Sequence, residues 1–177
     1  MSETRHVVFL VFDGMKMLDV TGPAEVFSEA NRFGAGYILD YVSPQGKAVV
    51  TSIGTMFPVT AAAADVVGAD TVVVSGGDDL PVKSIPPELI ASVLVLHARS
   101  RRMVSICTGS FILAVSGLLD GRRATTHWRH ADLLRTAHHD PPPHRRLPSP
   151  KAPGTLDRDR RPPHGRHTRR GRRGRRA

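Results

Sequence analysis

Cys107 is the only cysteine of the 177-residue chain, and it lies in the segment SICTGS at residues 105–110. A short apolar run at 103–106 precedes it, and the helical pattern FILAVSGLL follows. We expect a sharp strand-to-helix turn that lifts the thiol to the carboxyl end of a sheet. Backbone N–H groups at a helix start favour a thiolate and could hold an oxyanion, so Thr108 and Gly109 join Cys107 as candidate site residues. The alternative is a buried, inert thiol.

Three further segments could act with this thiol. Asp19 lies in LDVTGP, which we expect to be a loop at the carboxyl end of the first strand, the edge where open α/β sheets bind ligands. Its alternative role is to cap the next helix, and Asp13 competes for any catalytic role. Gly76 and Gly77 end the run TVVVS, where glycine lets a backbone N–H approach a reacting atom, although such a pair is more often a turn. His127, in ATTHW, is the third candidate, and its alternative is a purely structural role.

The elements that must position these residues alternate between strands and helices. Apolar, β-branched runs predict strands at 6–12, 36–42, 48–53, 71–75 and 103–106. Apolar stripes predict helices at 21–33, with Thr21 as its N-cap, at 86–99, and after residue 106. This alternation indicates an α/β fold with a doubly wound, mostly parallel sheet sandwiched by helices.

The charge of the chain is unevenly distributed. The chain holds 25 Lys+Arg and 16 Asp+Glu, a net charge of +9. Residues 1–137 hold 12 Lys+Arg and 13 Asp+Glu, whereas residues 138–177 hold 13 Lys+Arg and 3 Asp+Glu. The last segment also carries 8 of the 14 Pro and few apolar side chains, so it cannot offset the entropy of ordering its backbone. We therefore expect an α/β domain over 1–137 and a disordered Arg/Pro-rich tail over 138–177.

Taken together and in this order, the motifs resemble the ThiJ/PfpI superfamily, relatives of the class I glutamine amidotransferases. LDVTGPAEVFSEANRF and SICTGSFILAVSGLLDGRRATTHW are most similar to the amino-terminal domain of AraC/GlxA-type transcriptional regulators, with isonitrile hydratases as near neighbours. The resemblance covers about residues 5–137 and implies a flavodoxin-like fold. It also implies that Cys107 is the elbow nucleophile, Asp19 the acid that contacts it, Gly77 a backbone donor on the oxyanion side and His127 the third member near the thiol.

The resemblance implies a ligand-sensing domain of such a regulator, without the helix-turn-helix DNA-binding part. The alternative is an isonitrile hydratase-like enzyme or a Cys-dependent hydrolase or amidase. In that case the Cys107 thiolate attacks a small electrophile, the Asp19 carboxyl transfers a proton, and backbone N–H groups hold the negative charge. A non-functional fragment is the third possibility. We expect an amide, amine or isonitrile-like ligand and a homodimer, with no cofactor, no metal and no specific DNA binding by this chain alone.

The resemblance ends after Leu134, where the family continues with further strands and a helix. A frameshift in a GC-rich gene is the favoured explanation, because GC-rich codons read out of frame yield Arg, Pro, Gly, Ala and His. The codons of Leu156-Asp157 and of residues 164–167, shifted by one base, can encode Trp-Thr and Thr-Ala-Gly-Ile, two segments of the family pattern. The alternative is a basic tail that binds phosphates without sequence preference.

The chain lacks the pattern of a membrane or secreted protein. Its longest amino-terminal apolar run, VVFLVF, is far shorter than the roughly 18 residues that a membrane span needs. One cysteine cannot form an internal disulfide and fits a reducing compartment. We therefore expect a cytoplasmic protein.

Overall fold

A parallel β-sheet organises the computed structural model, which describes residues 4–137. Five strands lie in the order β5-β2-β1-β6-β7, and every pairing between them is parallel. In chain order these are β1 (Arg5–Leu10), β2 (Tyr37–Ser43), β5 (Ala61–Ala62), β6 (Ala69–Val74) and β7 (Ser100–Ser105). The prediction of a doubly wound, mostly parallel sheet is confirmed, whereas the predicted tail at 138–177 lies outside the described residues.

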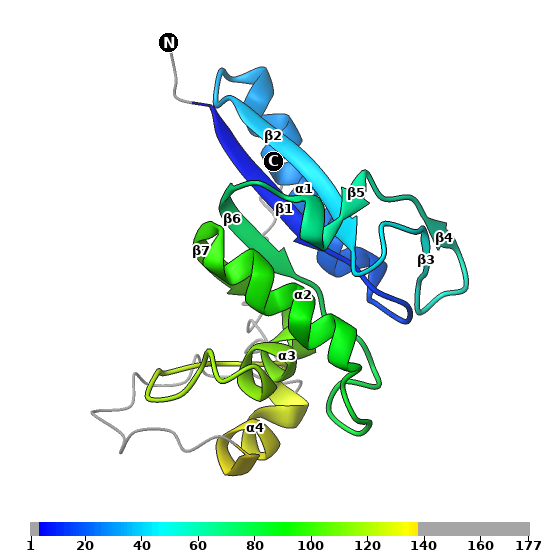
Figure 1. Cartoon of the computed structure of the whole chain (residues 1–177), viewed down its shortest axis with the longest axis vertical. Coiled ribbons are helices and arrows are strands. Elements are labelled where there is room, and N and C mark those ends of the chain that lie inside the picture. The colour runs from blue at the N-terminus through cyan, green and yellow to red at the C-terminus, as the bar shows by residue number, and fades with distance from the viewer. Residues whose placement is uncertain (1–3, 138–177) are drawn as a thin grey trace, which may run out of the picture. The chain divides into compact units, whose positions relative to one another are not determined.

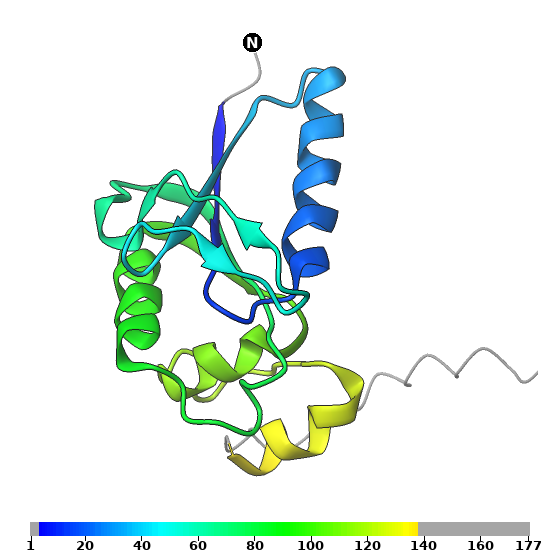
Figure 2. The same ribbon diagram turned by 90° about the vertical axis from the view of Figure 1, so that its right-hand side faces the viewer.

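Two long helices cover opposite faces of this sheet, as Figures 1 and 2 show. On one face, α1 (Met17–Arg32) packs on β1 and β2 through Phe27, whose ring contacts those of Phe9 and Tyr37. On the other, α2 (Pro87–Ala98) covers β6 and β7. The remaining helical elements are α3 (Ser110–Val115), α4 (Ala131–Ala137) and the 3₁₀ turns η1 (Ala63–Asp65), η2 (Cys107–Gly109) and η3 (Trp128–His130).

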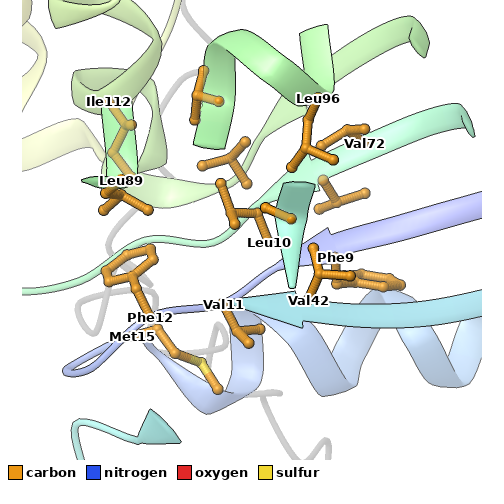
Figure 3. Packing of buried hydrophobic residues seen from close by; sticks show 14 of the residues in the cluster. Phe9, Leu10, Val11, Phe12, Met15, Val42, Val72, Leu89, Leu96 and Ile112 are labelled. Atoms are coloured by element: carbon orange, nitrogen blue, oxygen red, sulfur yellow. The ribbon is translucent and has the colours of Figure 1, made fainter. Parts of the chain in front are cut away.

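The core lies between these helices and the central strand β1. Residues Val7 to Leu10 are at most 1% exposed, because β1 has a strand on each side and a helix layer on each face. A strand covered on both faces reads as a continuous apolar run rather than an alternating one, which is why the sequence identified it. Figure 3 shows Leu10 in one cluster with Leu89 and Leu96 of α2.

The start of α1 differs from the sequence prediction. The helix begins at Met17, so Asp19 lies in its first turn rather than in a loop, and Thr21 is not an N-cap. The Thr21 hydroxyl instead donates to the Met17 carbonyl at 3.0 Å. Burial of Val20, which is 0% exposed, holds this extra turn against the sheet, and tertiary packing of this kind outweighs local capping signals.

The strand predicted at 48–53 is mostly a turn. Only β3 (Val49–Val50) is extended, and it pairs antiparallel with β4 (Met56–Phe57) in a separate two-stranded ribbon. Between them the chain reverses at Gly54, whose φ of +81° suits glycine. The Gly54 N–H donates to the Thr51 carbonyl at 2.9 Å.

Among residues 4–137, no helix has the length and apolar character needed to cross a bilayer.

Candidate functional site

Cys107 occupies a strained turn between β7 and α3. Its φ is +54°, and no other non-glycine residue of the described chain has a positive φ. The left-handed conformation costs a non-glycine residue about 1–2 kcal/mol, so the surrounding packing must hold it. Gly109 is part of that packing, since a Cβ there would lie 2.5 Å from the Val74 carbonyl oxygen. The turn therefore brings the half-buried thiol to the carboxyl edge of the sheet, as the sequence predicts.

Asp19, Gly76 and Cys107 converge at this edge. The Gly76 N–H donates to Asp19 Oδ2 at 3.0 Å. A Cβ on Gly76 would lie 2.7 Å from Asp19 Oδ2 and 2.9 Å from Cys107 Cβ, closer than real Cβ contacts. Glycine at position 76 is thus what lets the carboxyl of α1 and the cysteine after β7 approach the same point.

Burial raises the pKa of the Asp19 carboxyl above its ordinary value. Three smaller effects oppose this rise: the hydrogen bond from the Gly76 N–H, the charge of Lys16 and the charge of His127. Desolvation destabilises the carboxylate more than these partners stabilise it. Asp19 therefore keeps its proton to a higher pH than an exposed aspartate, which suits a group that gives a proton to a reacting atom.

The backbone of Gly76 and Gly77 is fully hydrogen-bonded. The Gly76 N–H donates to Asp19, and the Gly76 carbonyl accepts a hydrogen bond from the Lys16 N–H at 2.8 Å. The Gly77 N–H donates to the Thr108 hydroxyl at 2.9 Å, and that hydroxyl donates to the Gly77 carbonyl at 2.7 Å. The Gly77 N–H, to which the family resemblance gives the role of an oxyanion donor, is therefore bonded to Thr108, and an oxyanion would have to displace this hydroxyl.

His127 and its neighbour Thr126 approach the site from another segment. The Thr126 hydroxyl donates to the Cys107 carbonyl at 3.0 Å, a contact that sequence reasoning missed although the Thr-Thr pair before His127 marks it. His127 is half-buried, and its Nδ1 accepts from the Arg129 N–H at 3.3 Å at the start of η3. Within residues 4–137 no hydrogen bond joins His127 to Cys107, so the geometry links His127 to the site only through its charge on Asp19.

Metal-binding side chains do not gather at this edge. No group of three or more His, Cys, Asp or Glu in the part of the chain that the structure describes is arranged to hold a metal ion. The chemistry available from the described residues is that of a thiol, a carboxyl with a raised pKa and the backbone groups between them.

The fold and this constellation define a family. The chain belongs to the DJ-1/PfpI family, whose model matches residues 5–140. A solved ThiJ/PfpI family protein from Pseudomonas syringae superposes with a TM-score of 0.69 at 27% identity, covering 79% of this chain and 57% of that one. The resemblance read from the sequence motifs is thereby confirmed at the level of family and fold.

Three curated relatives show the range of functions within similar chains. The uncharacterized protein in the cpoL 5' region of Streptomyces lividans is 55% identical over 129 residues, which is 73% of this chain and 92% of that protein. Isonitrile hydratase of Pseudomonas putida is 32% identical over 131 residues, 74% of this chain and 56% of the enzyme. The HTH-type transcriptional regulator CdhR of Pseudomonas aeruginosa is 31% identical over 131 residues, 73% of this chain and 39% of the regulator. The chain thus spans about half or less of the hydratase and the regulator.

Proposed function

We propose that this domain binds a small molecule as the sensing domain of an AraC-type transcriptional regulator, without turning the ligand over. The similarity to the regulator CdhR supports this role. The observation that carries the proposal is the pair of hydrogen bonds between Thr108 and Gly77, which use the N–H and the carbonyl of Gly77 together.

Catalysis would require more of the Gly77 N–H than ligand binding does. Acyl-transfer sites need a donor that is already aimed at the developing negative charge, and loss of one such donor lowers kcat by about 10²–10³. Here the Gly77 N–H must first give up its bond to a buried hydroxyl. Binding requires no such charge stabilisation, because only the ground state of the ligand has to fit.

An isonitrile hydratase-like activity is the second candidate. It is favoured by 32% identity to isonitrile hydratase and by the convergence of Asp19 and Cys107 on Gly76. The Cys107 sulfur would bond to the isonitrile carbon while the protonated Asp19 carboxyl supplies the proton that this carbon gains. Water would then add to that carbon and expel the thiol, leaving the formamide. The raised pKa of Asp19 suits the first step.

The two candidates are separated by one panel of compounds tested on the full chain. Butylamine, acetamide and tert-butyl isonitrile are each titrated while thermal unfolding is followed, and the same samples are analysed for products. A bound ligand stabilises the folded state, by about 2.7 kcal/mol at a hundredfold excess over Kd. Sensing predicts a raised Tm with the ligand recovered intact. Consumption of a compound that is lost in Cys107→Ala overturns the proposal in favour of the enzyme, and no change in Tm with any compound counts against both.

A further inference from the structure

The loop between α3 and η3 brings His127 to the site with few attachments to the rest of the domain. Its residues 120–125 are all exposed, and Gly121 turns the chain with a φ of +68°. In the part of the chain that the structure describes, one hydrogen bond joins residues 120–127 to the chain before α3. It is the bond that the half-buried Thr126 hydroxyl donates to the Cys107 carbonyl at 3.0 Å.

The other contacts of the His127 side chain lie within its own segment. Its ring centroid is 5.6 Å from that of Trp128 and 5.8 Å from that of His130. Its Nδ1 accepts a hydrogen bond from the Arg129 N–H at 3.3 Å. Because these partners belong to the same short stretch of chain, they do not fix where His127 lies relative to the sheet.

The segment that carries His127 is attached on both sides of this residue. After it, the His130 ring meets the ring of Phe111 in α3 edge-on, with the centroids 6.4 Å apart. Before it, Thr126 is bonded to Cys107. The attachment on the side of the thiol therefore depends on a single hydroxyl group.

The peptide group to which Thr126 bonds is itself part of the site. The Cys107 carbonyl and the Thr108 N–H belong to one trans peptide, so they point in opposite directions. A Cβ on Gly76 would lie 2.9 Å from the Thr108 nitrogen and 2.7 Å from Asp19 Oδ2. The bond from Thr126 thus holds one side of a peptide group whose nitrogen lies beside Gly76.

We propose that Thr126 is a positioning residue of the Cys107 site, because its hydroxyl holds the segment that carries His127 beside the Cys107 turn. The inference goes beyond the sensing function proposed above, since it applies equally to a ligand that is bound and to one that reacts. Its test uses no ligand, so its failure leaves the sensing function to be decided by the compound panel.

The titration of Asp19 reports whether His127 stays in place. The charge of His127 is one of the effects that oppose the raised pKa of the Asp19 carboxyl. Histidine side chains are cationic at the acidic pH at which aspartates titrate, and the attraction between two charges falls with their distance. Lys16 also acts on Asp19, but it lies directly before α1 and does not depend on Thr126.

The test measures the effect of His127→Gln on the Asp19 midpoint by NMR titration of the full chain, from about pH 2 to pH 7. In the natural chain this substitution removes a positive charge and should raise the midpoint. In Thr126→Val, which has nearly the same shape without the hydroxyl, His127→Gln should leave the midpoint unchanged, because the ring is no longer held near the carboxyl. Such a double-mutant comparison isolates the coupling between the two positions.

Two matched controls accompany this comparison. Thr126→Ser keeps the hydroxyl, and Thr125→Val removes the hydroxyl of the exposed neighbouring residue. In both backgrounds His127→Gln should give the full rise of the Asp19 midpoint.

Two outcomes overturn the proposal. An equal rise in the Thr126→Val background shows that His127 keeps its place without the hydroxyl, which is what a role of Thr126 in stability alone predicts. An unchanged midpoint on His127→Gln in the natural chain shows that the charge of His127 does not reach Asp19. The second result is obtained even if Thr126→Val fails to fold.

Discussion

Replacement of Cys107 by glycine and by alanine measures the strain in the turn after β7. Both variants lack the sulfur, so their difference reports the backbone conformation. At a φ of +54°, alanine bears a left-handed penalty of about 1–2 kcal/mol that glycine avoids. Glycine loses about 0.5–1 kcal/mol through its greater freedom in the unfolded chain. We therefore expect Cys107→Gly to be more stable than Cys107→Ala by about 0.5–1 kcal/mol.

Urea unfolding of the full chain resolves a difference of this size. With a slope of about 2 kcal/mol per molar urea, the two midpoints should differ by about 0.3–0.5 M. Ala91→Gly in α2 is the control, because a helical, exposed position should show the opposite sign and lose about 1 kcal/mol. If Cys107→Ala is the more stable variant of the pair, Cys107 does not sit in a left-handed turn and the site geometry derived above is wrong.

Three further predictions follow from packing, burial and exposure. Gly109→Ala places a Cβ 2.5 Å from the Val74 carbonyl oxygen and should destabilise the fold by about 1–3 kcal/mol in thermal unfolding; an unchanged Tm would contradict the packing described. Because burial raises the pKa of Asp19, its contribution to stability is present below about pH 3.8 and is lost as pH rises through the folded-state pKa. Asp19→Asn should therefore gain stability relative to the natural chain between about pH 4 and pH 7 in urea titrations, and a constant difference would count against the raised pKa. We also propose that the chain forms a homodimer through the exposed apolar side chains of α1 and the β3–β4 ribbon, where Leu18 is 75% and Met56 72% exposed. Leu18→Asp should then give a monomer in light scattering, whereas a natural chain that is already monomeric would refute the proposal.

The sequence predicted the sheet most clearly at its two central strands. Residues Val7 to Leu10 of β1 are at most 1% exposed and residues Thr71 to Val74 of β6 at most 4%, so their apolar runs are continuous and easy to identify. The start of α1 was harder to predict from the sequence. Thr21 has a side chain typical of an N-cap, but the packing of Val20 decides where the helix begins. Local patterns do not contain that packing information.

That Asp19, Gly76 and Cys107 lie at one edge of the sheet was predictable, but their contacts were not. The order of Asp19, Gly76 and Cys107 along the chain indicated a shared edge, and the structure brings them within contact. The bond between Gly77 and Thr108 joins residues 31 positions apart and depends on how η2 packs beside the end of β6.

The fate of an isonitrile incubated with the full chain tests the central claim most directly. tert-Butyl isonitrile is supplied in large excess, and the corresponding formamide is quantified over time beside a parallel sample of Cys107→Ala. A sensing domain predicts equal amounts of formamide in both samples, no more than the uncatalysed background. Formation of many equivalents of formamide per chain, abolished in Cys107→Ala, would contradict the account and show that this member of the DJ-1/PfpI family is an enzyme.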